Sequence, residues 1–504
     1  VCGGLLPFPA GLRGTVWGMK IIDVAIVGAG FGGLCAAIRL RESGVDNVAI
    51  LERSGEVGGT WRDNVYPGCA CDVPSHMYSF SFEPNTRWTR PYPQQPEIQD
   101  YILRLTDTYR LRPLIRFHSD VRSMRWLAEQ NCWELAVEGQ PPLLARHVVL
   151  ATGPLSKPAI PDLPGLGSFA GETFHSGHWR HDVNLKGKRI AVVGTGASAI
   201  QFVPEIAPDA AHVDVFQRTA AWVMPRWDKP YGAARLWLYR HVPGLQRLSR
   251  WRVYWFNEMV GMGFMGSRRV QNMLRKLSGH HLQRQVADPA LRQALTPDFN
   301  PGCKRLLISN TWFPTLQRPN VQLVTQGVAR IAPEGVVGAD GALYPCDVIV
   351  WGTGFKATEF VAPMQVYGES ANGEPLELGK LWGAQPAATR LGITVAGFPN
   401  LFLLVGPNTG LGHNSIIFMI ECQVHYIVKA LQSLRASGKN ALRLRPDVQR
   451  DDYAVMQQKM KSTVWSSGCK SWYQNAQGEI DTLWPGYTWE YWLQTRRFKA
   501  SDYL

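Results

Sequence analysis

Short apolar runs that lead into glycine-rich turns are the clearest pattern along the chain. The run Ile21–Val27 enters such a turn directly, a helical pattern follows through Leu40, and a second apolar run, Val48–Leu51, ends at Glu52. Strand, glycine turn, helix and strand in this order are typical of the start of a Rossmann unit. We therefore expect a parallel sheet with packed helices near the N-terminus.

The same pattern occurs again in the middle of the chain. Arg189–Val193 predicts a strand, Ile200–Ile206 a helix and Val213–Phe216 the next strand, and strand-like runs return at Val321–Val324 and Val348–Trp351. The two copies predict an α/β fold with two Rossmann-like dinucleotide-binding domains.

Each copy carries a glycine fingerprint between its first strand and its helix. The first glycine permits a tight turn, the second lets the backbone approach a pyrophosphate, and the third position lets the helix pack on the strand. The N-terminus of the helix adds unpaired N–H groups and a partial positive charge. The first copy predicts FAD contacts at Gly28, Gly30 and Gly33. The second predicts contacts with a nicotinamide nucleotide at Gly194, Thr195, Gly196, Ala197, Ser198 and Ala199.

The residues at the ends of the second strands distinguish the two nucleotides. Glu52 lies 24 positions after Gly28, and Arg218 lies 24 positions after Gly194. A carboxylate accepts hydrogen bonds from the ribose hydroxyls of FAD. A guanidinium attracts a 2′-phosphate instead, and Thr219 adds a hydroxyl beside it. We therefore expect FAD in the first site and NADPH in the second.

A basic helical stretch interrupts the second copy. From Tyr231 to Leu295 the pattern is helical, with arginine and aromatic residues interleaved, and predicts an insertion over about 228–300. The net charge of +13 gathers here, because Arg226–Arg305 holds 15 Lys and Arg against 4 Asp and Glu. A solvated face or an attractive field for nucleotides explains this charge, and no nucleic-acid motif accompanies it. A membrane-surface amphipathic segment is the alternative to an insertion.

The chain of 504 residues is long enough for two or three domains. We expect an FAD-binding domain with a first part over 19–160 and a second part, including a C-terminal segment, over 386–504. An NADPH-binding domain covers 161–385. We interpret residues 1–18, which precede Met19 and the first strand pattern, as a disordered extension or a misassigned start.

Cysteine usage and hydropathy bear on the compartment. The nine cysteines are scattered along the chain, and no secretory signal is evident. No uninterrupted apolar run approaches the roughly 18 residues of a spanning helix. We therefore expect a protein of the reducing cytoplasm without integral membrane association. No metal site and no nucleic-acid partner are predicted.

Two longer segments resemble the fingerprints of Baeyer–Villiger monooxygenases, a family of class B flavin-dependent monooxygenases. Gly58–Asp72 matches the long fingerprint, and Phe169–Arg180 has Phe, Gly, His and Trp at the spacings of the second. The resemblance extends from about Ile21 to the C-terminus. Arg180 departs from the usual Pro or Asp, and Gly352 replaces the commoner Ala, but neither change removes a catalytic group.

The resemblance implies an FAD-dependent, NADPH-consuming monooxygenase. Such an enzyme inserts one oxygen atom of O2 next to a ketone carbonyl and forms an ester or lactone via a C4a-peroxyflavin. Its substrate would be a small apolar carbonyl compound, which the sequence does not specify further. An always-charged guanidinium suits this chemistry because it stabilises the peroxide anion and the oxyanion formed on the ketone.

The resemblance also implies roles for individual residues. Arg305 would be the catalytic cation, and Asp72 would hold it in place. Trp472 would close over the bound nucleotide. Further FAD contacts are expected at Thr60, Trp61, Arg62, Asp63, Asp72, Tyr78, Val121 and Ile416. Further NADPH contacts are expected at Arg218, Thr219, Lys304, Arg305 and Trp472.

Three other functions remain open. An N- or S-oxygenating flavin monooxygenase uses the same nucleotides but needs no catalytic arginine, and Trp179 and Lys304–Arg305 speak against it. A flavin disulfide reductase would use Cys69 and Cys71, but a disulfide across one intervening residue is strained. A non-catalytic binding module would carry no flavin.

Overall fold

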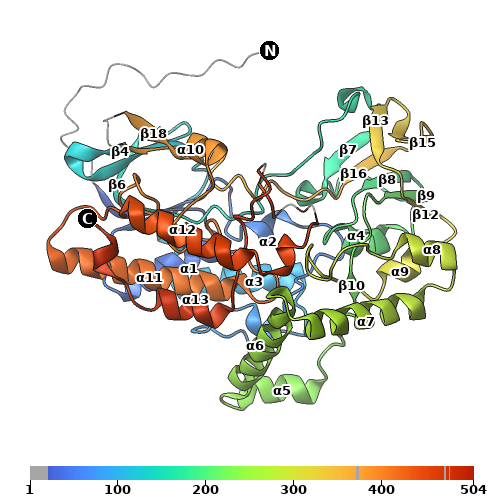
Figure 1. Cartoon of the computed structure of the whole chain (residues 1–504), viewed down its shortest axis with the longest axis horizontal. Helices are drawn as coiled ribbons and strands as arrows, with labels where there is room; N and C mark the ends of the chain where they lie inside the picture. Colours follow the sequence, from blue (N-terminus) through green and yellow to red (C-terminus); the bar gives the residue numbers. More distant parts are fainter. Residues whose placement is uncertain (1–20, 371–373, 470, 472, 476) are drawn as a thin grey trace.

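The computed structural model describes residues 21–370, 374–469, 471, 473–475 and 477–504. The N-terminal stretch 1–18 lies outside the described residues. Two sheets with their own helices form the two halves of the molecule seen at the left and right of Figure 1.

The first sheet has nine strands in the order β18-β17-β4-β5-β6-β1-β2-β3, and β19 pairs with β6 beside this path. Strands β1, β2, β3, β6 and β19 run parallel, whereas β5 is antiparallel to both β4 and β6. The strands are β1 (Ile22–Val27), β2 (Val48–Leu51), β3 (Ile115–Arg116), β4 (Val121–Leu127), β5 (Cys132–Val137), β6 (Leu143–Leu150), β17 (Gln365–Glu369), β18 (Pro375–Glu377) and β19 (Leu401–Leu403).

Strand β1 is an apolar run because both faces of the sheet are covered. Val24 and Ile26 pack in one core with helices from distant parts of the chain, and Ala25 and Val27 pack on the other side with β4 and β5. The helices of the first core are α1 (Phe31–Glu42), α3 (Gln95–Thr108), α11 (Ile416–Ser437), α12 (Pro446–Met460) and α13 (Thr488–Thr495). The C-terminal part of the chain therefore returns to the first sheet.

The second sheet is fully parallel, with five strands in the order β12-β9-β8-β16-β7. Helix α4 (Ala199–Ile206) packs on one face, and a three-stranded antiparallel sheet packs on the other. The strands of the parallel sheet are β7 (Glu172–His175), β8 (Arg189–Val193), β9 (His212–Phe216), β12 (Val321–Val324) and β16 (Val348–Trp351); those of the antiparallel sheet are β13 (Val328–Ala332), β14 (Gly335–Gly338) and β15 (Leu343–Pro345).

The basic stretch in the second unit is helical, as expected. It leaves and re-enters through a short parallel pair of strands, β10 (Val223–Met224) and β11 (Leu307–Ile308). Helices α5 and α6 project from the rest of the molecule at the bottom of Figure 1. The helices are α5 (Ala233–His241), α6 (Leu245–Phe264), α7 (Arg268–Gln285) and α8 (Pro289–Ala294).

The two predicted Rossmann-like units are confirmed, and several strand bounds agree residue for residue with the sequence pattern. The extension of the first sheet by β5, β4, β17 and β18, which mixes antiparallel and parallel pairs, was not predicted. Among the helices in the described part of the chain, none is long and apolar enough to cross a bilayer.

Candidate active site

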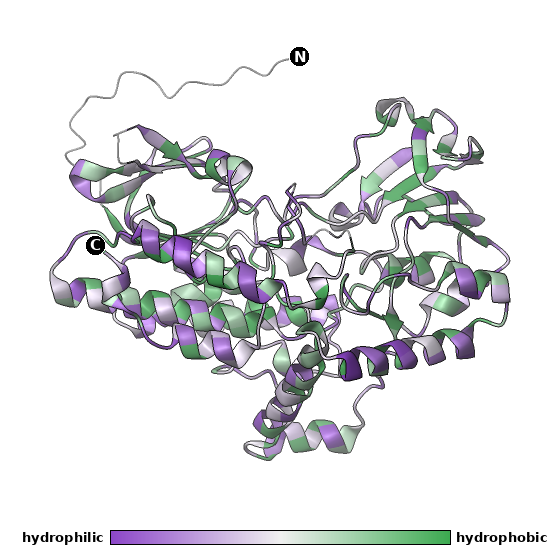
Figure 2. Cartoon of the chain, in the orientation of Figure 1, coloured by the Kyte–Doolittle hydropathy of each residue, from purple (hydrophilic) through white to green (hydrophobic). Residues whose placement is uncertain are grey.

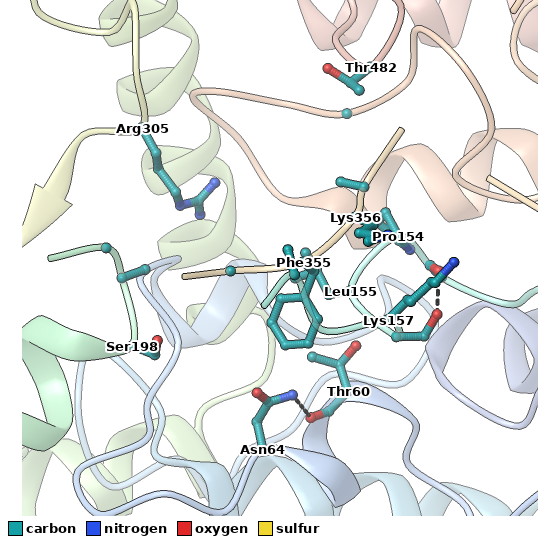
Figure 3. A pocket seen from close by; sticks show the side chains of 18 of the residues that line it. Thr60, Asn64, Pro154, Leu155, Lys157, Ser198, Arg305, Phe355, Lys356 and Thr482 are labelled. Atoms are coloured by element: carbon teal, nitrogen blue, oxygen red, sulfur yellow. Dashed lines mark hydrogen bonds between the residues drawn. The ribbon is translucent and has the colours of Figure 1, made fainter. Parts of the chain in front are cut away.

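A single cavity of about 1920 Å³ lies between the two units. This exceeds the roughly 300–1,000 Å³ of a site for one drug-sized ligand. Both glycine turns line it, and so do the two connections between the units, residues 151–157 and 352–357. Figure 3 shows Phe355 from one connection between Leu155 from the other and the side chain of Arg305.

The first glycine turn leaves room for a ligand at its middle position. Gly28 has φ +105°, and a Cβ atom there would lie 2.6 Å from the carbonyl oxygen of Ala151. A Cβ atom on Gly33 would overlap the carbonyl oxygen of Gly28. At Gly30, in contrast, the nearest atom would be 3.8 Å away, on Gly59. Packing therefore requires the outer glycines, and the open space at Gly30 fits a pyrophosphate.

The second turn repeats this geometry at the start of α4. Gly194 has φ +107°, and a Cβ atom there would lie 2.5 Å from the carbonyl oxygen of Gly352. At Gly196 the nearest atom would be 3.9 Å away. Ala199 occupies the third position and is fully buried. Gly196, Ala197 and Ser198 line the cavity directly before α4, where the N-terminus of a helix favours a phosphate.

Glu52 is buried at the end of β2, where its carboxylate is held by several donors. The backbone N–H of Ala29 donates to Oε2 at 2.8 Å, and Ser54 N–H and Arg62 Nη1 donate to Oε1 at 3.0 Å each. These bonds fix a carboxylate beside the first glycine turn, where an adenosine ribose requires an acceptor.

The segment after Gly58 forms one wall of the cavity. Gly58 and Gly59 adopt positive φ, and the short helix α2 (Thr60–Asp63) follows. Trp61 Nε1 donates to the Tyr78 hydroxyl at 2.8 Å, and the two rings meet edge to face. Burial raises the pKa of Tyr78 well above its usual value, so this wall carries a neutral phenol.

Arg305 and Asp72 form a two-bond ion pair at the cavity wall. Arg305 Nε donates to Asp72 Oδ2 at 2.8 Å, and Nη2 donates to Oδ1 at 2.7 Å. The Asp72 carboxylate raises the pKa of Arg305 further above its usual range. The Arg305 side chain is 34% exposed, and it points into the cavity in Figure 3. The site therefore holds a permanent, oriented cation.

In the ketone-oxidising enzyme that the family resemblance implies, replacing Asp72 by Asn should lower the turnover number by about 10–100-fold, since a hydrogen bond to a charged group contributes about 1.5–3 kcal/mol. The amide keeps the shape but removes the charge that orients Arg305. The turnover number and the thermal midpoint of the FAD-loaded enzyme would be compared with those of Asp182→Asn. Asp182 pairs with an arginine at the surface, so its variant should match wild type. A wild-type rate for Asp72→Asn would contradict the orienting role.

Lys304 and Arg218 bring two cations together beside the second glycine turn. Lys304 Nζ donates to the Thr219 hydroxyl at 3.0 Å. Burial and the nearby charge of Arg218 both lower the pKa of Lys304. Like charges repel unless an anion lies between them, so the arrangement fits a phosphate group.

The described residues with predicted nucleotide contacts line the cavity, apart from Gly33 and Ala199, which pack beneath the turns. Trp472 lies outside the described residues. The residues that line the cavity are Gly28, Gly30, Glu52, Thr60, Trp61, Arg62, Asp63, Asp72, Tyr78, Val121, Gly194, Thr195, Gly196, Ala197, Ser198, Arg218, Thr219, Lys304, Arg305 and Ile416.

Two residues of the site were missed by sequence reasoning. Gln201 on α4 accepts from the Tyr66 hydroxyl at 3.0 Å and donates to the carbonyl oxygen of Ala70 at 3.0 Å, so it joins the two units. Burial raises the pKa of Tyr473 to about 12, although the nearby Arg305 acts in the opposite direction. Neither residue belongs to a recognisable motif. The only signal in the sequence is that Gln201 lies in the predicted helix directly after the second glycine turn, close to the expected nucleotide site.

The cysteines depart from the expectation of a fully reduced protein at one pair. Cys303, directly before Lys304, forms a disulfide with Cys469 in the C-terminal part. Cys69 and Cys71 are free and buried, and burial raises the pKa of Cys69 to about 12. These two thiols stay protonated at neutral pH, which does not suit the redox pair of a disulfide reductase.

Comparison with known proteins agrees with this geometry. Residues 21–254 match the model of flavin-binding monooxygenase-like proteins. The chain is 45% identical over 485 residues to a Baeyer–Villiger monooxygenase of Streptomyces coelicolor, covering 96% of this chain and 92% of the relative. The chain belongs to the Baeyer–Villiger monooxygenase family. It is also 43% identical over 482 residues to a Baeyer–Villiger monooxygenase of Pseudomonas aeruginosa, covering 95% and 90% of the two chains.

Solved structures of Baeyer–Villiger monooxygenases share the fold. Cyclohexanone monooxygenase from Rhodococcus bound to NADP+ superposes with a TM-score of 0.84 at 28% identity, covering 95% of this chain and 97% of the other. A steroid monooxygenase bound to NADP gives 0.82 at 30% identity, covering 94% and 97%. The protein is an NADPH-dependent flavin monooxygenase with FAD as its second cofactor, and it converts ketones to esters or lactones.

Proposed function

We propose that this Baeyer–Villiger monooxygenase oxidises an apolar ketone, with Arg305 as the catalytic cation and Asp72 as the residue that positions it. The observation that carries the proposal is the two-bond ion pair between these residues on the wall of the cavity that both glycine turns line.

The chemistry needs a donor that never loses its charge. When bound, FAD accepts hydride from NADPH and activates dioxygen. Arg305 stabilises negative charge as it develops on the carbonyl oxygen of the ketone. A guanidinium has five N–H donors in a fixed plane, and Asp72 engages one edge of it. The remaining donors can therefore serve an oxyanion without any change in protonation.

The other nucleotide contacts follow from the charges at the two turns. Glu52 accepts from the ribose hydroxyls of FAD, and Lys304, Arg218 and Thr219 bind the 2′-phosphate of NADPH. Aromatic side chains such as Trp61 and Tyr78 help to keep water from the reacting centre. The Gly30 and Gly196 positions accept the two pyrophosphates.

Apolar side chains in the cavity wall favour an apolar substrate. Leu411, Ile416, Ile420 and Leu483 line the cavity from the C-terminal part, and Phe355 lines it from one connection between the units. The similar solved structures include a cyclohexanone monooxygenase with ε-caprolactone bound and a steroid monooxygenase. Cyclic and steroid ketones are therefore the first substrates to test.

A panel of linear, cyclic, aryl and steroid ketones would test the proposal. NADPH consumption would be measured with each ketone and compared with the amount of ester or lactone found by mass spectrometry. Equal amounts of oxidised NADPH and ester identify a substrate. Consumption without ester for every ketone would contradict the proposed substrate class.

A further inference from the structure

Helix α6 exposes a stripe of large apolar side chains and buries polar side chains on its inner side. Its inner side carries Gln246, Arg250 and Glu258, and Glu258 is only 3% exposed. On its outer side Trp251 is 60% exposed and Phe256 is 51% exposed. A soluble helix normally buries its apolar stripe, so the outer side of α6 lacks the cover that its composition requires.

The inner polar groups are all used within the protein. Arg250 Nη1 donates to the carbonyl oxygens of His76 and Ser79 at 3.0 and 2.7 Å. Glu258 accepts from the side chains of Asn414 and Thr488. These bonds fix how α6 is turned about its axis, because rotating it would leave buried charges without partners. The exposure of the apolar side is therefore built into the fold.

Helix α5, which packs on α6, also carries exposed apolar side chains. We define the α5–α6 face by the exposed side chains Trp237, Leu238, Leu248, Trp251, Trp255 and Phe256. The two helices project from the molecule in Figure 1, and Figure 2 shows apolar and strongly polar residues mixed on them, whereas α7 is mostly hydrophilic. An exposed apolar patch rimmed by polar residues marks an interaction site.

The exposed charged side chains of α5 and α6 are basic. Arg240, Arg247 and Arg252 are exposed on the same two helices. Glu258 is the only acidic residue between Lys229 and Ala287, and it is buried. Helices α5 and α6 therefore offer tryptophan and arginine to a partner but no exposed carboxylate of their own.

We propose that the α5–α6 face binds to the surface of an anionic lipid bilayer. Tryptophan is favoured at the boundary between headgroups and acyl chains, and arginine can keep its charge at the headgroups while its stem covers apolar surface. Basic residues at a membrane surface are attracted to anionic lipids. A second copy of the chain is less suitable, because a twofold contact pairs the face with itself. Two arginine-bearing surfaces would then meet without an exposed carboxylate from α5 or α6 to neutralise them.

Vesicle sedimentation with the FAD-loaded enzyme would test this proposal. The probes are vesicles of phosphatidylcholine alone and of phosphatidylcholine mixed with phosphatidylserine. We expect binding only to the vesicles with phosphatidylserine, weaker binding at high salt, and a blue shift of tryptophan fluorescence. Trp251→Ser/Trp255→Ser should weaken binding by tenfold or more, and Arg247→Glu/Arg252→Glu should abolish it.

Matched variants separate the face from general surface effects. Leu343→Ser/Val455→Ser removes two comparably exposed apolar side chains on β15 and α12, and Arg330→Glu reverses an exposed charge on β13. These controls should bind vesicles as wild type does. FAD absorbance and NADPH oxidation without vesicles would confirm that every variant is folded.

Three results would overturn the proposal. The first is the absence of binding to both kinds of vesicle. The second is equal binding by wild type and both face variants. The third is a wild-type dimer in solution that Trp251→Ser/Trp255→Ser converts to a monomer, because the face would then be covered by a second copy.

Discussion

Arg305→Ala is expected to reduce ester formation by about 10²–10³-fold, which corresponds to about 3–4 kcal/mol for one oxyanion donor. The alanine side chain lacks the guanidinium, whose permanent positive charge Asp72 holds at the cavity wall. FAD should remain bound, because the first glycine turn and Glu52 belong to the other unit. The measurement is the rate of ester formation per bound FAD, with NADPH oxidation followed in parallel.

Two companion variants define what this loss means. Arg305→Lys keeps the charge but cannot form the planar two-bond contact with Asp72, so it should recover only part of the rate. Arg180→Ala removes an exposed arginine that pairs with Glu172 and Asp182 at the surface, and it should behave as wild type. If Arg305→Ala makes ester at the wild-type rate, the guanidinium is not the catalytic cation.

Arg218→Ala should remove most of the preference for NADPH over NADH. A charged hydrogen bond to the 2′-phosphate contributes about 1.5–3 kcal/mol, so the KM for NADPH should rise about 10–100-fold. The KM for NADH should change little, since NADH lacks that phosphate. Lys304→Ala should act in the same direction, because Lys304 and Arg218 lie close enough for their charges to interact.

The ratio of kcat/KM for the two nucleotides is the deciding measurement. Lys188→Ala, which removes an exposed lysine next to β8, is the control for a general loss of positive charge. A loss of activity that is equal with NADPH and NADH would mean that Arg218 supports the fold and does not bind the 2′-phosphate of NADPH.

The two nucleotide turns were predictable because their information is local. Each needs a buried strand, glycines that no side chain can replace and a helix start, and all of these lie within about 30 consecutive residues. Strands such as Val48–Leu51 and Val348–Trp351 were bounded correctly because both faces are buried and because the apolar run of each strand ends at a charged residue or a glycine.

Contacts between distant segments could not be read from local patterns. The strands β4 and β5 alternate apolar and polar residues too irregularly for the sequence to predict that they extend the first sheet. The pairing of Asp72 with Arg305 spans 233 positions and rested on family resemblance alone. Gln201 could not be identified as a bridge either, because its partner Tyr66 lies in the other unit.

The disulfide between Cys303 and Cys469 closes a ring across 166 positions of the chain. A protease that cuts anywhere inside this ring leaves one covalent molecule until a thiol reductant is added. Enzyme prepared with a reductant therefore carries two free thiols at Cys303 and Cys469, whereas enzyme prepared without one carries the disulfide. The two forms differ in whether the C-terminal segment is tethered directly beside Lys304, the proposed ligand of the 2′-phosphate.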